Sequence, residues 1–364
     1  MDFVTQRFYP VNPDFRNPFG RDRDRIIHSS YFRRLEYKTQ VFLNHSGDYF
    51  RTRLTHSLEV SQIARTLATN LGLNADLAEA IALAHDLGHT PFGHAGGDEL
   101  DKVMRKYGYS NGFEHNFQSF RVVTKLEKRY KDFEGLNLTF ATLEGILKHS
   151  YPYEKPFLSA NLKTTFKPEF HPSLEAILVD LSDEIAYLSH DIDDGIKYGL
   201  INFDLLRDSE LVNTAMIYVE EVEKINREDS IFKHRFTSRL ISTLVYDILE
   251  NNAVFNQEIP QCFKYSANEP LPLTHTKKME KEIKTLKKIL FKHLYYHEEI
   301  ARKMFMGKRC VRKLYECFND EIRLLPKDLQ ERIQRGEKIH RVCADYIASM
   351  TDRYAIALYK ELGF

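Results

Sequence analysis

Apolar residues recur at helical spacing along much of the chain. The clearest run is 174–196, where leucines and isoleucines follow one another in steps of three and four, as on one face of an amphipathic helix. The stretch 54–71 shows the same period. A third helix is expected to begin at Asn74 and to end near His85, because Gly88 and a proline follow. Strand patterns are few and short, so the sequence predicts an all-α fold.

Two segments interrupt the helical pattern. Prolines and Gly20 break up the N-terminal arm, so the first helix is expected to start at about Asp22. The stretch 251–274 contains prolines and shows little periodicity, and helical patterns resume after it. We therefore expect a core over residues 1–250, which includes the arm, and a helical C-terminal subdomain over residues 251–364 that packs on the core.

The composition excludes some classes of protein. The chain of 364 residues has 52 basic and 52 acidic residues, so any binding of nucleic acid or nucleotide must come from a local concentration of charge. Its four cysteines form no CxxC pair, which argues against a zinc ribbon or a disulfide framework and favours a reducing compartment. The N-terminus lacks the pattern of a signal peptide, and no apolar run is long enough for a membrane span. A cytoplasmic protein that does not associate with membranes is expected.

Histidines and carboxylates on three predicted helices can meet around one metal ion. His85 and Asp86 end one helix, and His56 lies on the helix before it. Asp183 is one of several carboxylates on the polar side of the helix over 174–196. A single His-Asp pair is a weak signal, because a histidine at a helix end also interacts favourably with the helix dipole. The adjoining glycine-rich loop strengthens the metal interpretation, since it carries two more histidines, His89 and His94.

The expected ligand set, two imidazole nitrogens and two carboxylate oxygens, suits Mn, Fe, Co or Mg better than structural zinc. A bound divalent ion activates water and polarises a phosphoryl oxygen. Tyr187 and Asp191 lie one turn apart on the same side of their helix as Asp183, so they could contact a ligand of the metal ion. The open alternatives are that Tyr187 is a core residue and that Asp191 and Asp194 form a solvated acidic face.

Four segments occur along the chain in the order RTRLTHSLEV, AHDLGHTPFGHAG, FEHNFQSFR and DLSDEIAYLSHDIDDG. Together they resemble the deoxyguanosine triphosphate triphosphohydrolases of the HD superfamily, from about residue 21 to residue 198 and more weakly through the C-terminal helices. The resemblance implies an HD-domain helical bundle with a helical C-terminal extension. It also implies an enzyme that converts a deoxynucleoside triphosphate, dGTP or several dNTPs, into the deoxynucleoside and inorganic triphosphate by attack of water at the α-phosphorus.

The resemblance also implies roles for individual residues. The ligands of a divalent metal ion would be His56, His85, Asp86 and Asp183. His94 matches a catalytic histidine, and two residues that line the phosphates and assist catalysis are matched by His89 and His115. The substrate would be bound at a phosphate by Arg53, near the sugar by Gln40, and at the ribose 3′-hydroxyl by Tyr187 and Asp191. The charge of a triphosphate calls for such cationic and hydrogen-bonding groups, and histidine has a pKa suited to moving one proton.

Other roles for some of these residues stay open. Arg53 could pair with a helix carboxylate, His115 could cap the helix that follows it, and His190 could be structural or exposed. Arg235, on the helix after residue 231, is a candidate for a further phosphate contact.

One position departs from the family pattern. Members usually carry a glutamate after the glycine of the PFGHxG segment, where it partners the catalytic histidine, and this chain has Gly97 there. Asp98 or Glu99 is a candidate substitute. Two other functions therefore stay open: an HD phosphohydrolase that acts on another nucleotide phosphoester, and a catalytically weak regulator that binds a nucleotide or DNA.

The basic tracts 277–288 and 303–313 bear on partners. Acidic residues are interspersed within or beside them, which favours a solvated helix face over a nucleic-acid surface. The resemblance implies a homo-oligomer and, as in some members of the family, a response to a nucleotide effector or to single-stranded DNA.

Overall fold

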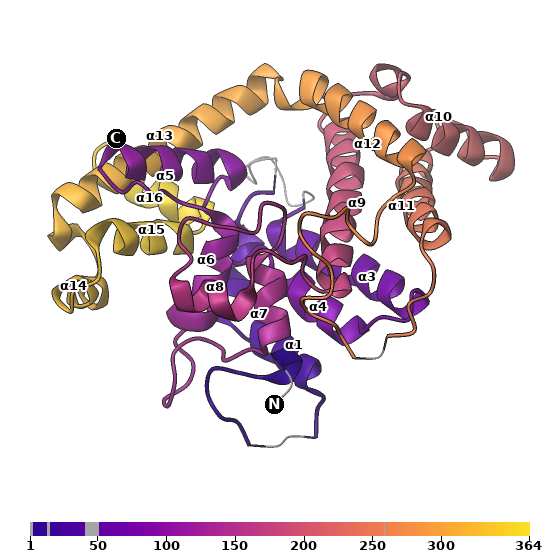
Figure 1. The fold of residues 1–364 in the computed structure, drawn as a ribbon. Coiled ribbons are helices and arrows are strands. Elements are labelled where there is room, and N and C mark those ends of the chain that lie inside the picture. The colour runs from indigo at the N-terminus through magenta and orange to yellow at the C-terminus, as the bar shows by residue number, and fades with distance from the viewer. Residues whose placement is uncertain (1–2, 13–14, 41–50, 258) are drawn as a thin grey trace.

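The computed structural model describes residues 3–12, 15–40, 51–257 and 259–364 (Figure 1). Within these residues the regular elements are helices, and the β contacts are two isolated bridges, Thr39 with Thr52 and Phe170 with Ser266. The prediction of an all-α fold is confirmed. The α-helices are α1 (Pro18–Ile27), α2 (Ser30–Arg34), α3 (Arg53–Asn70), α4 (Ala75–Ala84), α5 (Gly93–Lys106), α6 (His115–Arg121), α7 (Phe140–Leu147), α8 (Ala160–Phe166), α9 (Leu174–Lys197), α10 (Glu210–Ile217), α11 (Phe232–Asn251), α12 (Lys277–Leu290), α13 (Glu298–Asp320), α14 (Lys327–Gln334), α15 (Ile339–Ser349) and α16 (Asp352–Glu361).

Helices α3, α4 and α9 occur where the hydrophobic pattern predicts them. Each starts at a capping residue: the side chains of Thr52, Asn74 and Ser173 accept a hydrogen bond from a backbone N–H in the first turn. Such caps satisfy N–H groups that have no partner inside the helix, and they fix where each helix begins.

Helix α1 starts earlier than expected. It begins at Pro18 rather than near Asp22, because the Asn17 side chain caps it by accepting a 2.7 Å hydrogen bond from the Gly20 N–H. A proline in the first position of a helix loses no hydrogen bond. The expectation that prolines delay this helix was therefore wrong.

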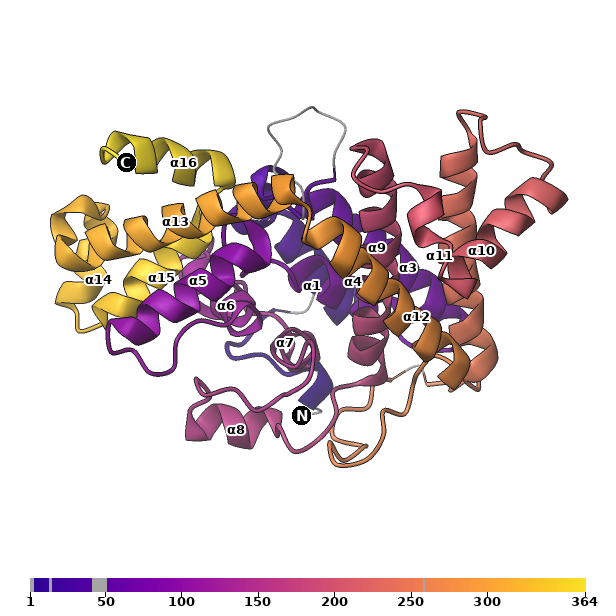
Figure 2. The ribbon, with the colours of Figure 1, turned by 90° about the horizontal axis from the view of Figure 1, so that it is seen from above.

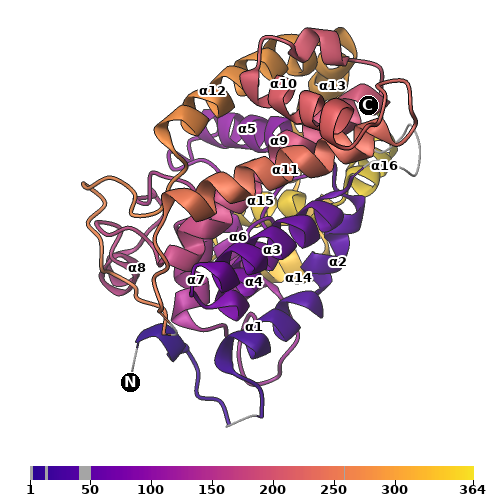
Figure 3. The ribbon, with the colours of Figure 1, turned by 90° about the vertical axis from the view of Figure 1, so that its right-hand side faces the viewer.

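The main core lies between α3, α4, α9 and α11, with α10 and α12 closing it. Helix α9 contacts both α3 and α11, and Figure 3 shows α11 beside α3. Leu67, Leu178 and Leu240 are among its fully buried residues. This packing brings the polar side of α9 against the N-terminal half of α3 and the end of α4.

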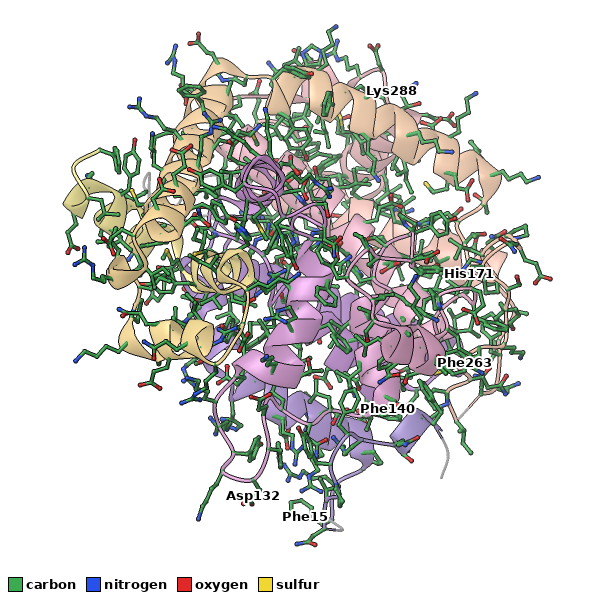
Figure 4. The ribbon with its side chains drawn as sticks, turned by 60° about the vertical axis from the view of Figure 1, so that its left-hand side comes forward. Phe15, Asp132, Phe140, His171, Phe263 and Lys288 are labelled. Carbon is green, nitrogen blue, oxygen red and sulfur yellow. The ribbon has the colours of Figure 1, made fainter. Side chains whose placement is uncertain are left out.

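A second core gathers aromatic side chains from α6, α7 and α8 around α1 and α2. Phe140 and Phe263, which come from distant parts of the chain, lie near each other in Figure 4. Both contact Phe3 edge-on, with ring centroids 5.5 and 4.6 Å away. The N-terminal arm is thereby attached to the helical body.

A third core joins α5 to the C-terminal helices α13, α15 and α16. Helices α12 and α13 arch across the molecule in Figure 1, and Figure 2 shows α13 running alongside α5. Helix α12 also packs Leu286 into the main core.

The division of the chain at residues 250 and 251 stays a prediction. Among the described residues, none of the helices combines the length and the apolar character that a membrane crossing requires.

Candidate metal centre and adjoining cleft

The four residues that the sequence singles out as metal ligands lie together where α3, α4 and α9 pack. His56 Nε2 is 2.8 Å from Asp183 Oδ1. His85 Nε2 is 3.4 Å from Asp86 Oδ1 and 3.9 Å from Asp183 Oδ1. Ligand atoms from three separate segments therefore converge on one point.

The donor set fits a divalent ion. Around an octahedral ion with bonds of about 2.1 Å, neighbouring ligand atoms lie about 3.0 Å apart and opposite ones about 4.2 Å apart, which is close to the distances found here. His85 Nδ1 is 2.6 Å from the Ala82 carbonyl, so its hydrogen is used there and Nε2 carries the lone pair. His85 Nε2 is buried without a hydrogen-bond partner among the described residues, a costly state unless a ligand binds there. The cluster could hold a metal ion.

The carboxylates of the cluster are kept ionised. Burial alone would raise the pKa of Asp86, but Arg53, 2.8 Å away, and the adjacent histidines hold that pKa well below its ordinary value. Burial also opposes the ionisation of Asp183, but the hydrogen bond from His149 holds the pKa of Asp183 well below its usual range. Ionised carboxylates are the forms that bind metal ions.

His149 belongs to this cluster and was missed by the sequence analysis. It follows α7, with Nε2 3.7 Å from Asp183 Oδ2 and Nδ1 2.5 Å from Asp180 Oδ1. Burial opposes its protonation, yet the two carboxylates raise the pKa of His149 well above its ordinary value. Although its geometry would also permit ligation beside His85 and Asp183, its charge suits a cationic partner of Asp183. A lone histidine after a helix carries no sequence signal for either role.

Three further histidines line a cleft of about 430 Å³ beside the cluster. The ring centroids of His89 and His115 are 4.2 Å apart, and that of His94 is 5.1 Å from His89. His89 Nε2 is 3.1 Å from Asp86 Oδ1, which connects the cleft to the cluster. Burial and the charge of Arg53 lower the pKa of His89, and burial with the neighbouring histidines lowers that of His115. Partial burial and the charge of Arg53 also lower the pKa of His94. All three imidazoles are therefore neutral near pH 7.

Direct backbone packing places His115 against the loop after α4. A Cβ on Gly88 would lie 2.2 Å from the His115 carbonyl oxygen, so only glycine fits there. The Ser119 hydroxyl accepts a hydrogen bond from the Gly88 N–H and donates one to the His85 carbonyl. Glu114, rather than His115, caps α6, which leaves the His115 ring to face the cleft.

Arg53 lies beside Asp86 of the cluster and is 2% exposed. Its Nη1 donates to Asp86, so the alternative that it pairs with a carboxylate is realised for one of its nitrogens. Its Nε and Nη2 are buried without hydrogen-bond partners among the described residues. Buried N–H donors of a cation are costly when unpaired, and their geometry matches an oxyanion such as phosphate.

The sugar-binding pair expected on α9 is joined by a third residue. Tyr295, in the π-helical turn Phe291–Tyr295, has its ring 6.2 Å from that of Tyr187 and nearly parallel to it. Its hydroxyl donates a hydrogen bond to Asp191. Burial and the nearby Asp194 raise the pKa of Asp191 well above its ordinary value. The sequence analysis did not include Tyr295 among the site residues.

The expected acidic face of α9 is not solvated. Asp191 and Asp194 are 2% and 4% exposed. Arg51 Nη1 lies 3.1 Å from Asp194 and 2.6 Å from Asp193, and so pairs with both carboxylates. The interpretation of Asp191 and Asp194 as a solvated face was wrong, because Arg51 reaches Asp194 from the segment before α3 and Tyr295 covers Asp191.

Of the two remaining predicted substrate-binding residues, Gln40 lies near the site and Arg235 does not. The Gln40 carbonyl would lie 3.2 Å from a Cβ on Gly93, so Gln40 is next to the start of α5, and its buried Oε1 has no partner among the described residues. Arg235 lies apart, since its exposed guanidinium pairs with Glu223 at 2.7 Å. The structure does not bring Arg235 into the group of histidines.

Comparison with known proteins connects this geometry to a family. The HD domain model matches residues 53–188, and the phosphohydrolase-associated domain matches residues 273–361. A deoxyguanosinetriphosphate triphosphohydrolase-like protein of Wolinella succinogenes is 64% identical over 98% of this chain and 98% of its own length. Proteins of the same name from Bordetella pertussis and Nitrosomonas europaea are 48% and 46% identical, over 96% and 98% of this chain and 91% and 94% of their own lengths. This chain belongs to the deoxyguanosinetriphosphate triphosphohydrolase-like family.

Membership of the deoxyguanosinetriphosphate triphosphohydrolase-like family confirms the resemblance inferred from the four segments. The HD domain match spans the cluster from His56 to Asp183. Together, the family and the cluster support a phosphohydrolase with a nucleotide substrate and a divalent metal ion.

Because position 97 is glycine, another carboxylate would have to partner His94. Glu99 is buried and forms an ion pair with Arg312, so it is directed away from His94. Asp98 is exposed and lines the cleft together with His94. His94 and Asp98 are one turn apart on α5, a spacing at which side chains meet. Of the two candidate substitutes, the geometry favours Asp98.

Proposed function

We propose that the protein hydrolyses a deoxynucleoside triphosphate, dGTP or several dNTPs, to the deoxynucleoside and inorganic triphosphate. The observation that carries the proposal is the position of Arg53. Its two unpartnered buried nitrogens lie directly beside the His and Asp cluster, so a phosphate could meet both at once. Cationic groups placed before reaction stabilise charge on a phosphoryl group.

The proposed metal is Mn, Mg, Fe or Co, held by His56, His85, Asp86 and Asp183. When bound, such an ion would activate water and polarise the phosphoryl oxygen. In the reaction, the water oxygen bonds to the α-phosphorus, the bond from that phosphorus to the sugar O5′ breaks, and the water proton is released. The O5′ then takes one proton.

The histidines of the cleft are suited to the proton transfer. His94 faces the cleft and is open to it, so we assign it as the group that takes up the proton released by the water and donates a proton to O5′. His89 and His115 would bind the phosphates through their N–H groups. Arg53 would bind the α-phosphate. Asp98, beside His94, would orient that ring in place of the family glutamate.

The sugar would lie along α9. Asp191, with its raised pKa, can accept and donate hydrogen bonds at a 3′-hydroxyl, and Tyr187 provides a ring edge next to it. Tyr295 closes the same side. Gln40 would contact the sugar from the loop side.

The product identifies the reaction. The protein is incubated with each dNTP in the presence of Mn²⁺ or Mg²⁺, and the products are separated by anion-exchange chromatography. Intact triphosphate and deoxynucleoside are expected, and EDTA should abolish both. Pyrophosphate or single phosphate would instead indicate an HD phosphohydrolase of another phosphoester. Binding of metal and nucleotide without turnover would indicate the alternative suggested by Gly97, a catalytically weak regulator.

Partners extend the proposal. We propose a cytoplasmic homo-oligomer that responds to a nucleotide effector or to single-stranded DNA. A groove of about 560 Å³ at the C-terminal end of α12 combines three lysines, including the exposed Lys288 of Figure 4, with Phe291 and Tyr296. Lysines beside exposed aromatic rings are groups that bind single strands. Light scattering with and without oligonucleotide tests both parts.

A further inference from the structure

A line of three side chains leads from the metal cluster to the surface. His56 and Glu59 lie one turn apart on α3, and His190 of α9 lies between their side chains. The two Nδ1 atoms of His56 and His190 are 3.3 Å apart. His190 Nε2 contacts Glu59 Oε2. His190 is 3% exposed, so the alternative that it is an exposed residue was wrong.

The chemistry at each end of this line defines the position of one proton. At the outer end, the Glu59 carboxylate only accepts hydrogen bonds when ionised, so His190 must donate from Nε2. Arg51 Nε lies 3.2 Å from the same carboxylate and favours its ionised form. At the inner end, His56 can ligate through Nε2 only if its hydrogen is on Nδ1.

A neutral His190 satisfies both ends. It donates from Nε2 to Glu59 and accepts at Nδ1 from the His56 Nδ1–H. His56 Nε2 then carries a lone pair that faces Asp183 Oδ1 at 2.8 Å. A lone pair and an ionised carboxylate repel at this distance unless a cation lies beside both, so the line of hydrogen bonds itself favours a cation in the cluster.

We propose that His190 and Glu59 are positioning residues, which hold His56 in the tautomer and ring orientation that bind a metal ion. This inference rests on the metal site of the proposed function. Metal-binding histidines commonly donate their second ring N–H to a carboxylate or carbonyl, which fixes the ring and raises its basicity. Here an imidazole is interposed between the ligand and the carboxylate.

The test is the Mn²⁺ affinity of the full-length protein, measured by titration calorimetry. His190→Ala leaves the His56 N–H without an acceptor, and the affinity should fall by roughly 10- to 100-fold. His190→Asn keeps an oxygen acceptor near the position of Nδ1 and should stay within about 3-fold of wild type. Glu59→Ala should lie between them, and it is tolerable for folding because the Glu59 side chain is 42% exposed.

A buried histidine elsewhere provides the matched control. His275 is 3% exposed and pairs with Asp247 of α11 at 2.7 Å. His275→Ala should cost stability without changing Mn²⁺ affinity. The visible spectrum of the Co²⁺-loaded protein should change for His190→Ala and not for His275→Ala.

The outcomes separate this inference from the function on which it rests. Equal Mn²⁺ affinity in wild type, His190→Ala and Glu59→Ala would overturn the positioning role and leave the metal site standing. An equal loss in His190→Asn and His190→Ala would also overturn it, because the acceptor would then be irrelevant. A wild-type protein that binds no divalent ion would overturn both.

Discussion

The Asp352 carboxylate accepts a 3.0 Å hydrogen bond from the backbone N–H of Phe92. Its second oxygen accepts one from Thr39, 3.1 Å away. Phe92 has a φ of 64°, a left-handed conformation that costs a non-glycine residue about 1–2 kcal/mol. It is followed by Gly93 and by His94, so the first residue of α16 holds the loop that presents the proposed proton donor.

Asp352→Asn should therefore damage both stability and activity. An amide can accept at one oxygen only, so one buried N–H loses its acceptor, at a cost of about 1–3 kcal/mol. Displacement of the loop should lower kcat by about 10-fold or more. Thermal unfolding and initial rates measure the two effects. Asp247→Asn, which removes one acceptor oxygen from the residues just before α12, is the control that should destabilise the protein and keep kcat. Equal kcat in the two variants would contradict the role of Asp352.

Arg53→Lys tests the phosphate contact. Lysine keeps the charge beside Asp86 but presents one nitrogen instead of a fork, so it cannot replace the two unpartnered donors. The loss of a preorganised donor to a reacting oxygen should lower kcat/KM by roughly 100-fold. Arg65→Lys, in an exposed ion pair on the same helix, should leave kcat/KM unchanged. A similar kcat/KM for both variants would remove Arg53 from the proposed mechanism.

The sequence predicted those parts of the site that depend on local pattern. Periodicity and capping residues located α3, α4 and α9, and the ordered segments indicated the proposed ligands, which lie on or next to these helices. The sequence analysis missed His149 and Tyr295. Each lies at or just after the end of a helix, in a segment that contains no motif. Their positions follow from how α7 and the turn after α12 pack on α9, which periodicity does not report.

The sequence pattern also could not predict which charged side chains are buried. A stripe of aspartates on one side of a helix is typical of a solvated face. Asp193 and Asp194 are buried because Arg51, more than 140 positions away, reaches them. Similarly, the neutral His190 between His56 and Glu59 depends on the register of α9 against α3 rather than on any motif.

Asp98 can be tested by moving the carboxylate along α5. Asp98→Asn should lower kcat by roughly 10- to 100-fold, because His94 loses the charged group that orients it. Gly97 has no positive φ, and a Cβ there would meet only ordinary contacts at 3.7 and 3.9 Å, so Gly97→Glu fits. The double variant Gly97→Glu with Asp98→Asn should recover most of the loss, since the glutamate then occupies the position usual in the family. Rates of the three variants at saturating substrate decide the matter. An Asp98→Asn protein as active as wild type would show that His94 works without this partner.

Glu175 should make the stability of the protein depend on pH. It is fully buried on α9, where one carboxylate oxygen accepts from the Asn74 N–H at 3.1 Å and the other has no partner among the described residues. Burial raises the pKa of Glu175 to about 7, from an ordinary value of 4.5. Between these values the folded protein retains a proton that the unfolded chain has lost, so stability falls as pH rises through this window and levels off above it.

Glu175→Gln removes this dependence and keeps an oxygen for the Asn74 N–H. At pH 4.5 and below, the variant and wild type should be about equally stable, and by pH 8 the variant should be more stable by on the order of 2–3 kcal/mol. Chemical unfolding at four pH values measures the difference in unfolding free energy between the variant and wild type. The contributions of the other titrating groups cancel in this difference. Glu250→Gln, an exposed substitution, should give a difference near zero throughout. A difference between Glu175→Gln and wild type that does not change with pH would mean that Glu175 is ionised in the folded protein, stabilised by a partner close to its second oxygen.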